Sequence, residues 1–451
     1  MRILILQLLP DVRNRRVPRF APQLGTLLTL LKQRGHELAL LGLSSFDVLK
    51  IKAALAKHLP QLIYADISAV CADLARRTLQ HLHDHEFLPI VAGGEYATVE
   101  PAAALSLPSV QAVAIGEPDA SLVTYFERIK DPAAGQVVLG VWLRDEKGLA
   151  RPDMPALVED LDSLPFPERD LFGYADYVKA TGQIEIATGR GCPQQCAYCI
   201  NDWIESIYDE KGTWTRRRSP DNVLDEIDQL RQNYADVRIV YFTNHAFALD
   251  PAWLEPFLEA YARRCTLPFR CHVRANAADD TAVTRLAKAG CKLADVELIS
   301  GSNFVRNEIF DMDLSGEQIE GAFERLHEAG IATRAILYLG APYESEVSLD
   351  ETAALLRRLK PSVVDVRPYF PWPGTRARET ARDNGWLHLR GAEQYHRDAT
   401  GIDMPACRPP IVAAWIKKLR REFPAGLAEP WWRRWSSAGR APIDPFFPKR
   451  R

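Results

Sequence analysis

Three cysteines lie within the segment Gly189-Arg190-Gly191-Cys192-Pro193-Gln194-Gln195-Cys196-Ala197-Tyr198-Cys199. Closely spaced thiolates bind zinc or an iron–sulfur cluster. Structural zinc sites usually carry paired C-x2-C motifs, and the remaining cysteines are too scattered to supply a second pair. Three protein ligands on a four-iron cluster leave one iron open, as a catalytic metal site requires. The spacing C-x3-C-x2-C therefore favours a catalytic cluster over structural zinc or inert thiols.

The cysteine segment directly follows a predicted strand, Ile184–Thr188, and strands then alternate with helices. Ser219 and Pro220 predict one helix start, as an N-cap followed by proline at the first position. Six strand–helix units in about 190 residues predict a partial (β/α)6 barrel, because a full (β/α)8 barrel takes about 250 residues. The other predicted strands are Val237–Phe242, Phe269–Arg274, Leu293–Ile299, Thr333–Leu339 and Val363–Tyr369.

Residues 1–150 show the same alternation and predict a doubly wound, Rossmann-like parallel sheet. Ligands of such sheets bind beyond the carboxyl ends of the strands. Two glycine turns, Gly93-Gly94 and Gly116-Glu117, fall at that edge. The predicted strands are Met1–Leu6, Glu37–Leu41, Leu62–Tyr64, Leu88–Val91, Ala112–Ile115 and Val137–Trp142. The whole chain is thus predicted to be an α/β protein with two successive sheets.

Proline-rich residues 151–180 predict an extended linker between the first domain (1–150) and the barrel (181–385). Residues 386–451 differ in character, since tryptophans mix there with lysines and arginines. Two interpretations stay open for this segment. It is either a basic amphipathic cap over the barrel mouth or a partner surface, or its aromatic side chains pack on the barrel and leave a solvated basic face.

The composition excludes several classes of protein. The 451 residues carry 56 basic and 59 acidic side chains, and a net charge of −3 disfavours a dedicated nucleic-acid binder. No apolar run is long enough to span a membrane, and the N-terminal apolar run is too short for a signal peptide. Eight cysteines are too few for a disulfide scaffold. We expect a reducing, cytoplasmic location, because open thiolate clusters oxidise readily.

The cysteine motif, with Tyr198 before the last cysteine, closely resembles that of the radical S-adenosylmethionine (SAM) superfamily. The resemblance implies that Cys192, Cys196 and Cys199 hold a [4Fe–4S] cluster whose fourth iron binds SAM. Reduction of such a cluster typically cleaves SAM to a 5′-deoxyadenosyl radical.

The domain order is similar to that of the cobalamin-binding-domain subfamily. The residues that carry this likeness are Pro89–Thr98, Ala114–Leu122, Leu164–Leu171, Ser300–Ser302 and Pro371–Thr375. Three features depart from the pattern: Asn244 replaces an acidic residue, Ile299 replaces a glutamate, and residues 116–119 read Gly-Glu-Pro-Asp in place of the G-E-G-E segment. The first domain also has no D-x-H-x-x-G motif for ligating cobalt, an absence that is usual in this subfamily.

The resemblance implies a C-methyltransferase that moves a methyl group from SAM through methylcobalamin to an unactivated carbon. Its substrate would be a small molecule or a peptide, and its external electron donor a flavodoxin or ferredoxin. Three alternatives remain open. The chain could catalyse ring closure or rearrangement with the same cofactors, use SAM alone with a vestigial first domain, or be an iron–sulfur protein without turnover.

The resemblance and the strand ends suggest further site residues. Near the cluster and SAM we expect Tyr198, Asn244, Arg274, Ser300, Gly301 and Arg334. Near cobalamin we expect Ser68, Gly93, Gly94, Gly116 and Glu117. His245 could act as acid or base, and Tyr369 could face the substrate. Ordinary packing, helix capping, ion pairing or local hydrogen bonding is an alternative role for some of these residues, namely Ser68, Tyr198, His245, Arg274, Arg334 and Tyr369.

Overall fold

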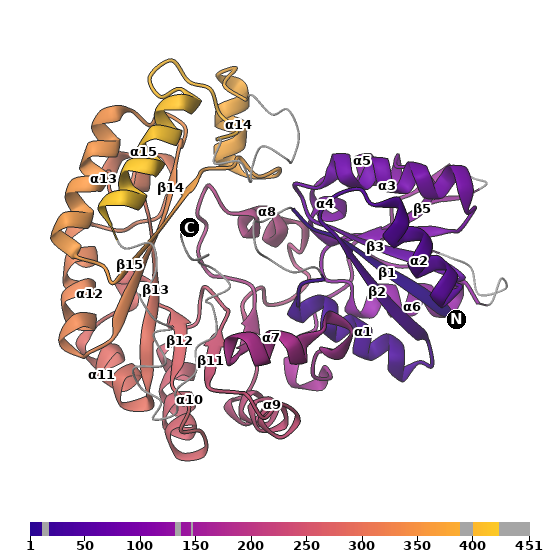
Figure 1. The fold of residues 1–451 in the computed structure, drawn as a ribbon, viewed down its shortest axis with the longest axis horizontal. Helices are drawn as coiled ribbons and strands as arrows, with labels where there is room; N and C mark the ends of the chain where they lie inside the picture. The colour runs from indigo at the N-terminus through magenta and orange to yellow at the C-terminus, as the bar shows by residue number, and fades with distance from the viewer. Residues whose placement is uncertain (11–17, 131–136, 146–147, 388–399, 424–451) are drawn as a thin grey trace.

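The structure is a computed structural model that describes residues 1–10, 18–130, 137–145, 148–387 and 400–423. Two sheets, each covered by helices, form two lobes, and helix α8 (Ile200–Ile207) lies between them (Figure 1). The predicted α/β class is confirmed. Among these residues, no helix combines the length and the apolar character needed to cross a membrane.

The first sheet has seven strands in the order β2-β1-β3-β4-β5-β6-β7. The first five in this order run parallel, as predicted: β1 (Arg2–Leu8), β2 (Glu37–Leu43), β3 (Leu62–Ile67), β4 (Ile90–Gly93) and β5 (Val110–Ala114).

The edge of this sheet differs from the prediction of parallel strands only. Strands β6 (Val141–Asp145) and β7 (Gly148–Ala150) pair antiparallel with each other, and β6 also pairs antiparallel with β5. Only two residues connect β6 to β7, and so short a connection permits only an antiparallel hairpin. Strand β6 also begins later than predicted, because Gly140 turns the chain with a φ of +72°.

Helices cover both faces of the first sheet, as in a doubly wound fold. Along β1, Leu4 and Leu6 face one helical layer, whereas Ile3 and Ile5 face the other. The first layer comprises α2 (Val48–His58), α3 (Ala72–His85), α4 (Gly94–Val99) and α5 (Pro101–Leu105). The second comprises α1 (Pro22–Gln33) and α6 (Asp119–Arg128).

The second sheet has six parallel strands in the order β15-β14-β13-β12-β11-β8, which confirms the six predicted strands of a partial barrel. They are β8 (Gln183–Ile186), β11 (Ile239–Phe242), β12 (Phe269–His272), β13 (Cys291–Ile299), β14 (Ala332–Leu339) and β15 (Val363–Pro368). The associated helices are α9 (Pro220–Asn233), α10 (Pro251–Arg264), α11 (Asp280–Ala289), α12 (Gly316–Glu328), α13 (Glu346–Leu359) and α14 (Arg376–Asp383). The predicted cap of α9 is also confirmed, since the Ser219 side chain accepts a hydrogen bond from the Asn222 amide.

Helix α15 (Pro409–Glu422) follows the barrel and packs on it through Trp415, Ile416 and Leu419. Lys417 and Lys418 on the same helix are exposed. For α15 this supports the interpretation of an aromatic face on the barrel and a solvated basic face. The remaining predicted tail residues, Trp431, Trp432, Arg433, Arg434 and Trp435, lie outside the described residues.

The segment predicted as an extended linker contains regular structure. It holds two short 3-10 turns, Leu161–Ser163 and Asp170–Phe172, and helix α7 (Tyr174–Thr181). It also contacts both lobes, because the Glu168 amide donates to the Gly25 carbonyl at 3.0 Å and Arg169 reaches into the barrel. The prolines restrict the backbone, but these contacts fix its path.

Arg169 is the most deeply placed cation of this segment. Its guanidinium donates to the carboxylate of Glu226 at 2.7 Å and to the Glu185 carbonyl at 2.8 Å, and both charged side chains are buried. Its carbon also lies 4.1 Å from the centre of the Phe20 ring. The contact therefore joins the linker to the first barrel strand.

We predict that Arg169→Ala lowers the free energy of unfolding by about 2 kcal/mol, because it removes buried hydrogen bonds to Glu226 and to the Glu185 carbonyl while Arg218 still pairs with Glu226. Urea denaturation measures the loss. Arg76→Ala breaks only the exposed pair with Asp73 and serves as the control, with a loss below about 1 kcal/mol. Equal small losses in both variants would contradict the role assigned to Arg169.

Candidate functional site

The cysteine loop leaves the barrel at the carboxyl end of β8. A short strand, β9 (Gly189–Arg190), precedes the loop and pairs antiparallel with β10 (Arg216–Arg217). Gly191 then turns the chain with a φ of +78°, and a Cβ there would lie 2.2 Å from the Trp214 carbonyl oxygen. Only glycine fits this turn, so the residue directly before Cys192 is fixed by backbone geometry.

The loop is tied down by backbone hydrogen bonds on both sides. The Ala197 amide donates to the Phe310 carbonyl at 2.9 Å, and the Ala377 amide donates to the Ala197 carbonyl at 2.9 Å. Arg376 adds a bond to the Gln195 carbonyl. These contacts set the path of the chain between the second and third cysteines.

The three thiols are grouped at the carboxyl end of the barrel. Cys196 is buried, Cys192 and Cys199 are half-buried, and no described cysteine is in a disulfide. Burial raises the pKa of all three thiols, to about 12 for Cys199, and neighbouring thiols of the loop raise the pKa of Cys192 and Cys199 further. Arg274 lies beside them, with its guanidinium 3.7 Å from the Cys196 sulfur. A bound cation would compensate the charge that burial disfavours, so the donor set fits a thiolate-ligated metal centre.

Aromatic side chains surround the loop. Tyr198 lies at the edge of the Phe310 ring, with 5.2 Å between ring centroids, and 6.2 Å from the Tyr338 ring. Tyr369, predicted to face the substrate, is fully buried against Phe310 at 5.2 Å. Tyr198 therefore neighbours the thiols, whereas Tyr369 belongs to the packed layer behind Phe310.

The predicted SAM-side residues lie at neighbouring strand ends. Asn244 bridges the strand to the cysteine loop, since it accepts from the Thr188 amide at 2.5 Å and donates to the Gly189 carbonyl at 2.7 Å. The Arg274 side chain is buried and donates to the Met312 carbonyl, while its Nε makes no hydrogen bond with the described residues.

Ser300 and Gly301 form the turn after β13. The Ser300 side chain is buried and accepts from the Ser302 amide at 3.2 Å. A Cβ at Gly301 would lie 2.3 Å from the Cα of Thr352, so the backbone approaches α13 too closely for any side chain. The turn is therefore fixed by packing against α13.

Arg334 lies near the start of β14, away from the carboxyl ends of the strands, and belongs to a chain of ion pairs. It binds Asp365 at 2.5 Å and lies 3.7 Å from Asp295, which in turn binds Arg270 at 2.7 Å. Arg367 also binds Asp365, at 2.5 Å. This network fills the barrel interior and gives Arg334 a structural partner on each side.

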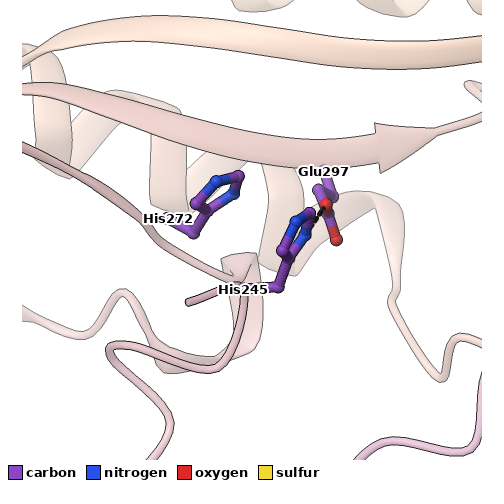
Figure 2. A group of neighbouring side chains, drawn as sticks. All are labelled: His245, His272 and Glu297. Atoms are coloured by element: carbon purple, nitrogen blue, oxygen red, sulfur yellow. Dashed lines mark hydrogen bonds and ion pairs between the residues drawn. The ribbon is translucent and has the colours of Figure 1, made fainter. Parts of the chain in front are cut away.

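Three further polar side chains converge at the carboxyl ends of β11, β12 and β13: His245, His272 and Glu297 (Figure 2). His245 is hydrogen-bonded to Glu297, and its ring stacks on His272 with 4.1 Å between centroids. The Glu297 carboxylate raises the pKa of His245, whereas burial lowers the pKa of His272 well below its usual value. Of these three, the sequence analysis identified only His245.

A cavity of about 850 Å³ lies between the carboxyl edge of the first sheet and the cysteine side of the barrel. Of the residues predicted to bind cobalamin, Ser68, Gly94, Gly116 and Glu117 line it, and Gly93 lies directly beside it. On the barrel side the lining includes Gly189, Arg190, Gly191, Arg367 and Trp372. The volume is in the range of cavities that hold large ligands.

Glycine is required at the turns that shape this cavity. Gly94 has a φ of +85°, and a Cβ there would lie 2.6 Å from an Asp66 carboxylate oxygen. Gly116 has a φ of +70°, and its Cβ would lie 2.1 Å from the Tyr208 hydroxyl. At Gly93, a Cβ would lie 2.2 Å from the Tyr64 hydroxyl. The predicted glycine turns are therefore fixed by close approach.

Glu117, predicted to bind cofactor, is engaged in an ion-pair network between the lobes. Its carboxylate binds Arg190 at 2.7 Å and also binds Arg216, while Asp119 binds Arg190 through a second oxygen at 3.2 Å. The Glu117 amide also donates to the Tyr208 hydroxyl at 2.6 Å. We call these five residues the interlobe clamp. They join the glycine edge of the cavity to the strand that leads into the cysteine loop.

The barrel lobe is similar to a known protein family. Residues 186–356 match the family model of the radical SAM superfamily. The chain therefore carries a radical SAM domain, which contains all three loop cysteines.

The sequence matches to three curated relatives cover more of the chain than that domain. An uncharacterized methyltransferase of Pyrococcus horikoshii is 23% identical over 74% of this chain and 71% of its own length. Cytidylyl-2-hydroxyethylphosphonate methyltransferase of Streptomyces wedmorensis is 24% identical over 55% of this chain and 52% of its own. Anaerobic magnesium-protoporphyrin IX monomethyl ester cyclase of Rubrivivax gelatinosus is 25% identical over 66% of this chain and 54% of its own. The chain thus spans about half the length of the last two.

Solved structures share the two-lobed fold. The methyltransferase TsrM of Kitasatospora setae, with cobalamin and a [4Fe–4S] cluster bound, has a TM-score of 0.65 at 19% identity, covering 86% of this chain and 79% of that one. OxsB with aqua-cobalamin bound has a TM-score of 0.66 at 17% identity, covering 93% and 61%. At these identities the likeness establishes the fold.

We predict that Glu117→Gln lowers the free energy of unfolding by about 3 kcal/mol, because it leaves the buried Arg216 without its carboxylate partner. Chemical denaturation measures the loss. Asp153→Asn removes the exposed partner of Lys211 and should cause no comparable loss. If the two variants unfold alike, the interlobe clamp does not stabilise the fold.

We predict that Asp66 makes stability depend on pH. Burial and the nearby Glu95 carboxylate raise the pKa of Asp66 from 3.8 to about 7. The folded protein therefore binds a proton that the unfolded chain releases, so this stabilisation is complete below about pH 4 and is lost as the pH rises through 7. In urea titrations from pH 4 to 8, Asp66→Asn should flatten this decline, whereas the exposed Asp73→Asn should not. An unchanged slope in Asp66→Asn would refute the assignment.

Proposed function

We propose that this chain is a cobalamin-dependent radical SAM enzyme that transfers a methyl group to an unactivated carbon of its substrate. The observation that carries the proposal is the juxtaposition of two features. Residues 189–191, which lead directly into the three-cysteine loop, line one side of a large cavity, and the glycine turns of a doubly wound sheet line the other. Ligands of doubly wound sheets bind at that edge, and the active sites of barrels lie at the carboxyl ends of their strands.

The donor groups fit a [4Fe–4S] cluster and SAM. Three closely spaced thiols supply three of four iron ligands. The buried Nε of Arg274 has no hydrogen-bond partner among the described residues, and the side chain already lies beside Cys196. A guanidinium in this position is suited to the SAM carboxylate through paired hydrogen bonds. Tyr198 lies in the same loop, with its ring at the edge of Phe310.

The cavity fits a corrin cofactor. The turns at Gly94 and Gly116 form a floor of main chain on the sheet side of the cavity, which a flat ring can approach closely. Ser68 adds a hydroxyl on the lining, which is bonded to Glu95 at 3.1 Å. The interlobe clamp holds this floor in register with the cysteine loop. The substrate would then lie between the two cofactors, near Trp372 and Arg367.

When bound, the reduced cluster supplies the electron that cleaves SAM, and cobalamin carries the methyl group. The protein's part is to position both cofactors and to exclude water. Electrons would come from an external flavodoxin or ferredoxin, and the substrate would be a small molecule or a peptide. The related methyltransferases and TsrM favour methyl transfer.

A second candidate is ring closure with the same cofactors and no methyl transfer. It is favoured by the relative named as an anaerobic magnesium-protoporphyrin IX monomethyl ester cyclase. A vestigial first lobe is less well supported, because the cavity keeps its glycine-lined wall.

The test is anaerobic reconstitution with iron, sulfide and hydroxocobalamin, followed by desalting and quantification of iron and corrin. We expect about four irons per chain, as in a [4Fe–4S] cluster, and one retained corrin. Methyl-labelled SAM then reports transfer to a product, whereas label left in SAM or its fragments favours the cyclase. Four irons without corrin would refute cobalamin dependence.

We predict that Ser68→Phe abolishes corrin retention but leaves the iron content unchanged, because the new ring fills the cavity on the side away from the cysteines. Ser106→Phe, at an exposed position of the same lobe, is the matched control and should retain corrin. Cys196→Ser should show the converse, with iron lost and corrin kept. Corrin retention by Ser68→Phe would place the cofactor elsewhere.

A further inference from the structure

Two histidines and one carboxylate, none of them in the cysteine loop, lie together at the carboxyl ends of three barrel strands. One candidate ligand atom from each of His245, His272 and Glu297 lies within 4.8 Å of the others (Figure 2). Two imidazoles and one carboxylate form the ligand set of many catalytic zinc and non-haem iron sites. We propose that these three residues bind one divalent first-row transition-metal ion, such as Zn²⁺ or Fe²⁺.

The surroundings of His272 suit a metal ligand, because one ring nitrogen is held and the other is unpartnered. Its side chain is buried, and its Nδ1 has no hydrogen-bond partner among the described residues. Its Nε2 lies 2.8 Å from the Tyr241 hydroxyl, which fixes the orientation of the ring. A metal-bound histidine commonly has its second nitrogen held in this way.

Glu297 and His245 complete the set from two other elements. Glu297 projects from β13, while His245 lies on the turn after β11 and is 60% exposed. The two imidazole planes are now inclined by only 24°, so their nitrogen lone pairs do not converge. Because His272 and Glu297 are held by strands, His245 is the side chain that must rotate to bind the ion. Because His245 is exposed, the positions on the metal ion that these three residues do not fill would face the barrel opening.

The competing interpretation is that His245 forms only an ion pair with Glu297, stacks on the His272 ring and binds no metal. Both interpretations explain the contacts in Figure 2, but only a metal site uses the unpartnered Nδ1 of His272. A metal titration therefore separates them. The three residues belong neither to the cysteine loop nor to the cavity lining, but Glu297 lies near enough to the loop to raise the pKa of its thiols. The titration below therefore uses protein in which the loop cannot bind metal.

The experiment uses the full chain with Cys192, Cys196 and Cys199 replaced by serine, so that the loop cannot bind the probe. Anaerobic titration with Co²⁺ is followed by visible absorption. We expect one equivalent to bind with the bands of a nitrogen- and oxygen-ligated site and without an intense thiolate band. Equilibrium dialysis with Zn²⁺ should show the same stoichiometry and displace the cobalt.

The ligand variants His272→Ala and Glu297→Gln should lose this binding. Tyr241→Phe should weaken it about 10- to 100-fold, since it removes only the group that orients His272. His327→Ala is the matched control, because His327 is bonded only to Thr333, away from the site. Circular dichroism checks that each variant folds. No Co²⁺ spectrum in the folded parent protein, or an undiminished spectrum in folded His272→Ala, would overturn the proposal, whatever the iron and corrin content of the wild type.

Discussion

The interlobe clamp is the interaction on which the geometry of the whole site depends. Arg190 lies two residues before Cys192, and Glu117 directly follows Gly116 on the cavity wall. The ion pair between them therefore links the two halves of the site through very little intervening chain. Buried charges are stabilising only when all their partners are present, so the clamp favours one relative position of the lobes and disfavours others.

Local patterns predicted most of the fold. The barrel strands and the start of α9 could be predicted because apolar runs, N-caps and prolines act within a few residues. The pattern of residues 137–142 predicts a strand of the parallel sheet, whereas β6 pairs antiparallel with both neighbours. Strand direction depends on the connection and not on the strand's own residues. The linker was predicted as extended, but its turns depend on distant contacts such as the one between Arg169 and Glu226.

The site residues also fall into two groups: those in local sequence motifs could be predicted, and those brought together from distant segments could not. The cysteines could be found because all three lie in one short segment, and the glycine turns because they follow predicted strands. Glu117 lines the cavity, as its predicted place beside cobalamin requires, but its bonds to Arg190 and Arg216 could not be predicted because these arginines are distant in sequence. His272 and Glu297 were missed because barrel curvature brings three separate strand ends together. The available signal was the alternation of polar residues along β12 and β13, which marks the face turned into the barrel.

The anchoring of the cysteine loop bears on how the protein could survive oxidative damage. The bonds at Ala197 and from Arg376 to Gln195 are made by backbone groups and a guanidinium, and none involves a sulfur atom. Chemical change at the thiols therefore leaves these anchors intact. In the proposed enzyme, a chain that had lost its iron to oxygen and was then reduced would present its cysteines in the same place. Repair would require only delivery of iron and sulfide, without refolding of the barrel.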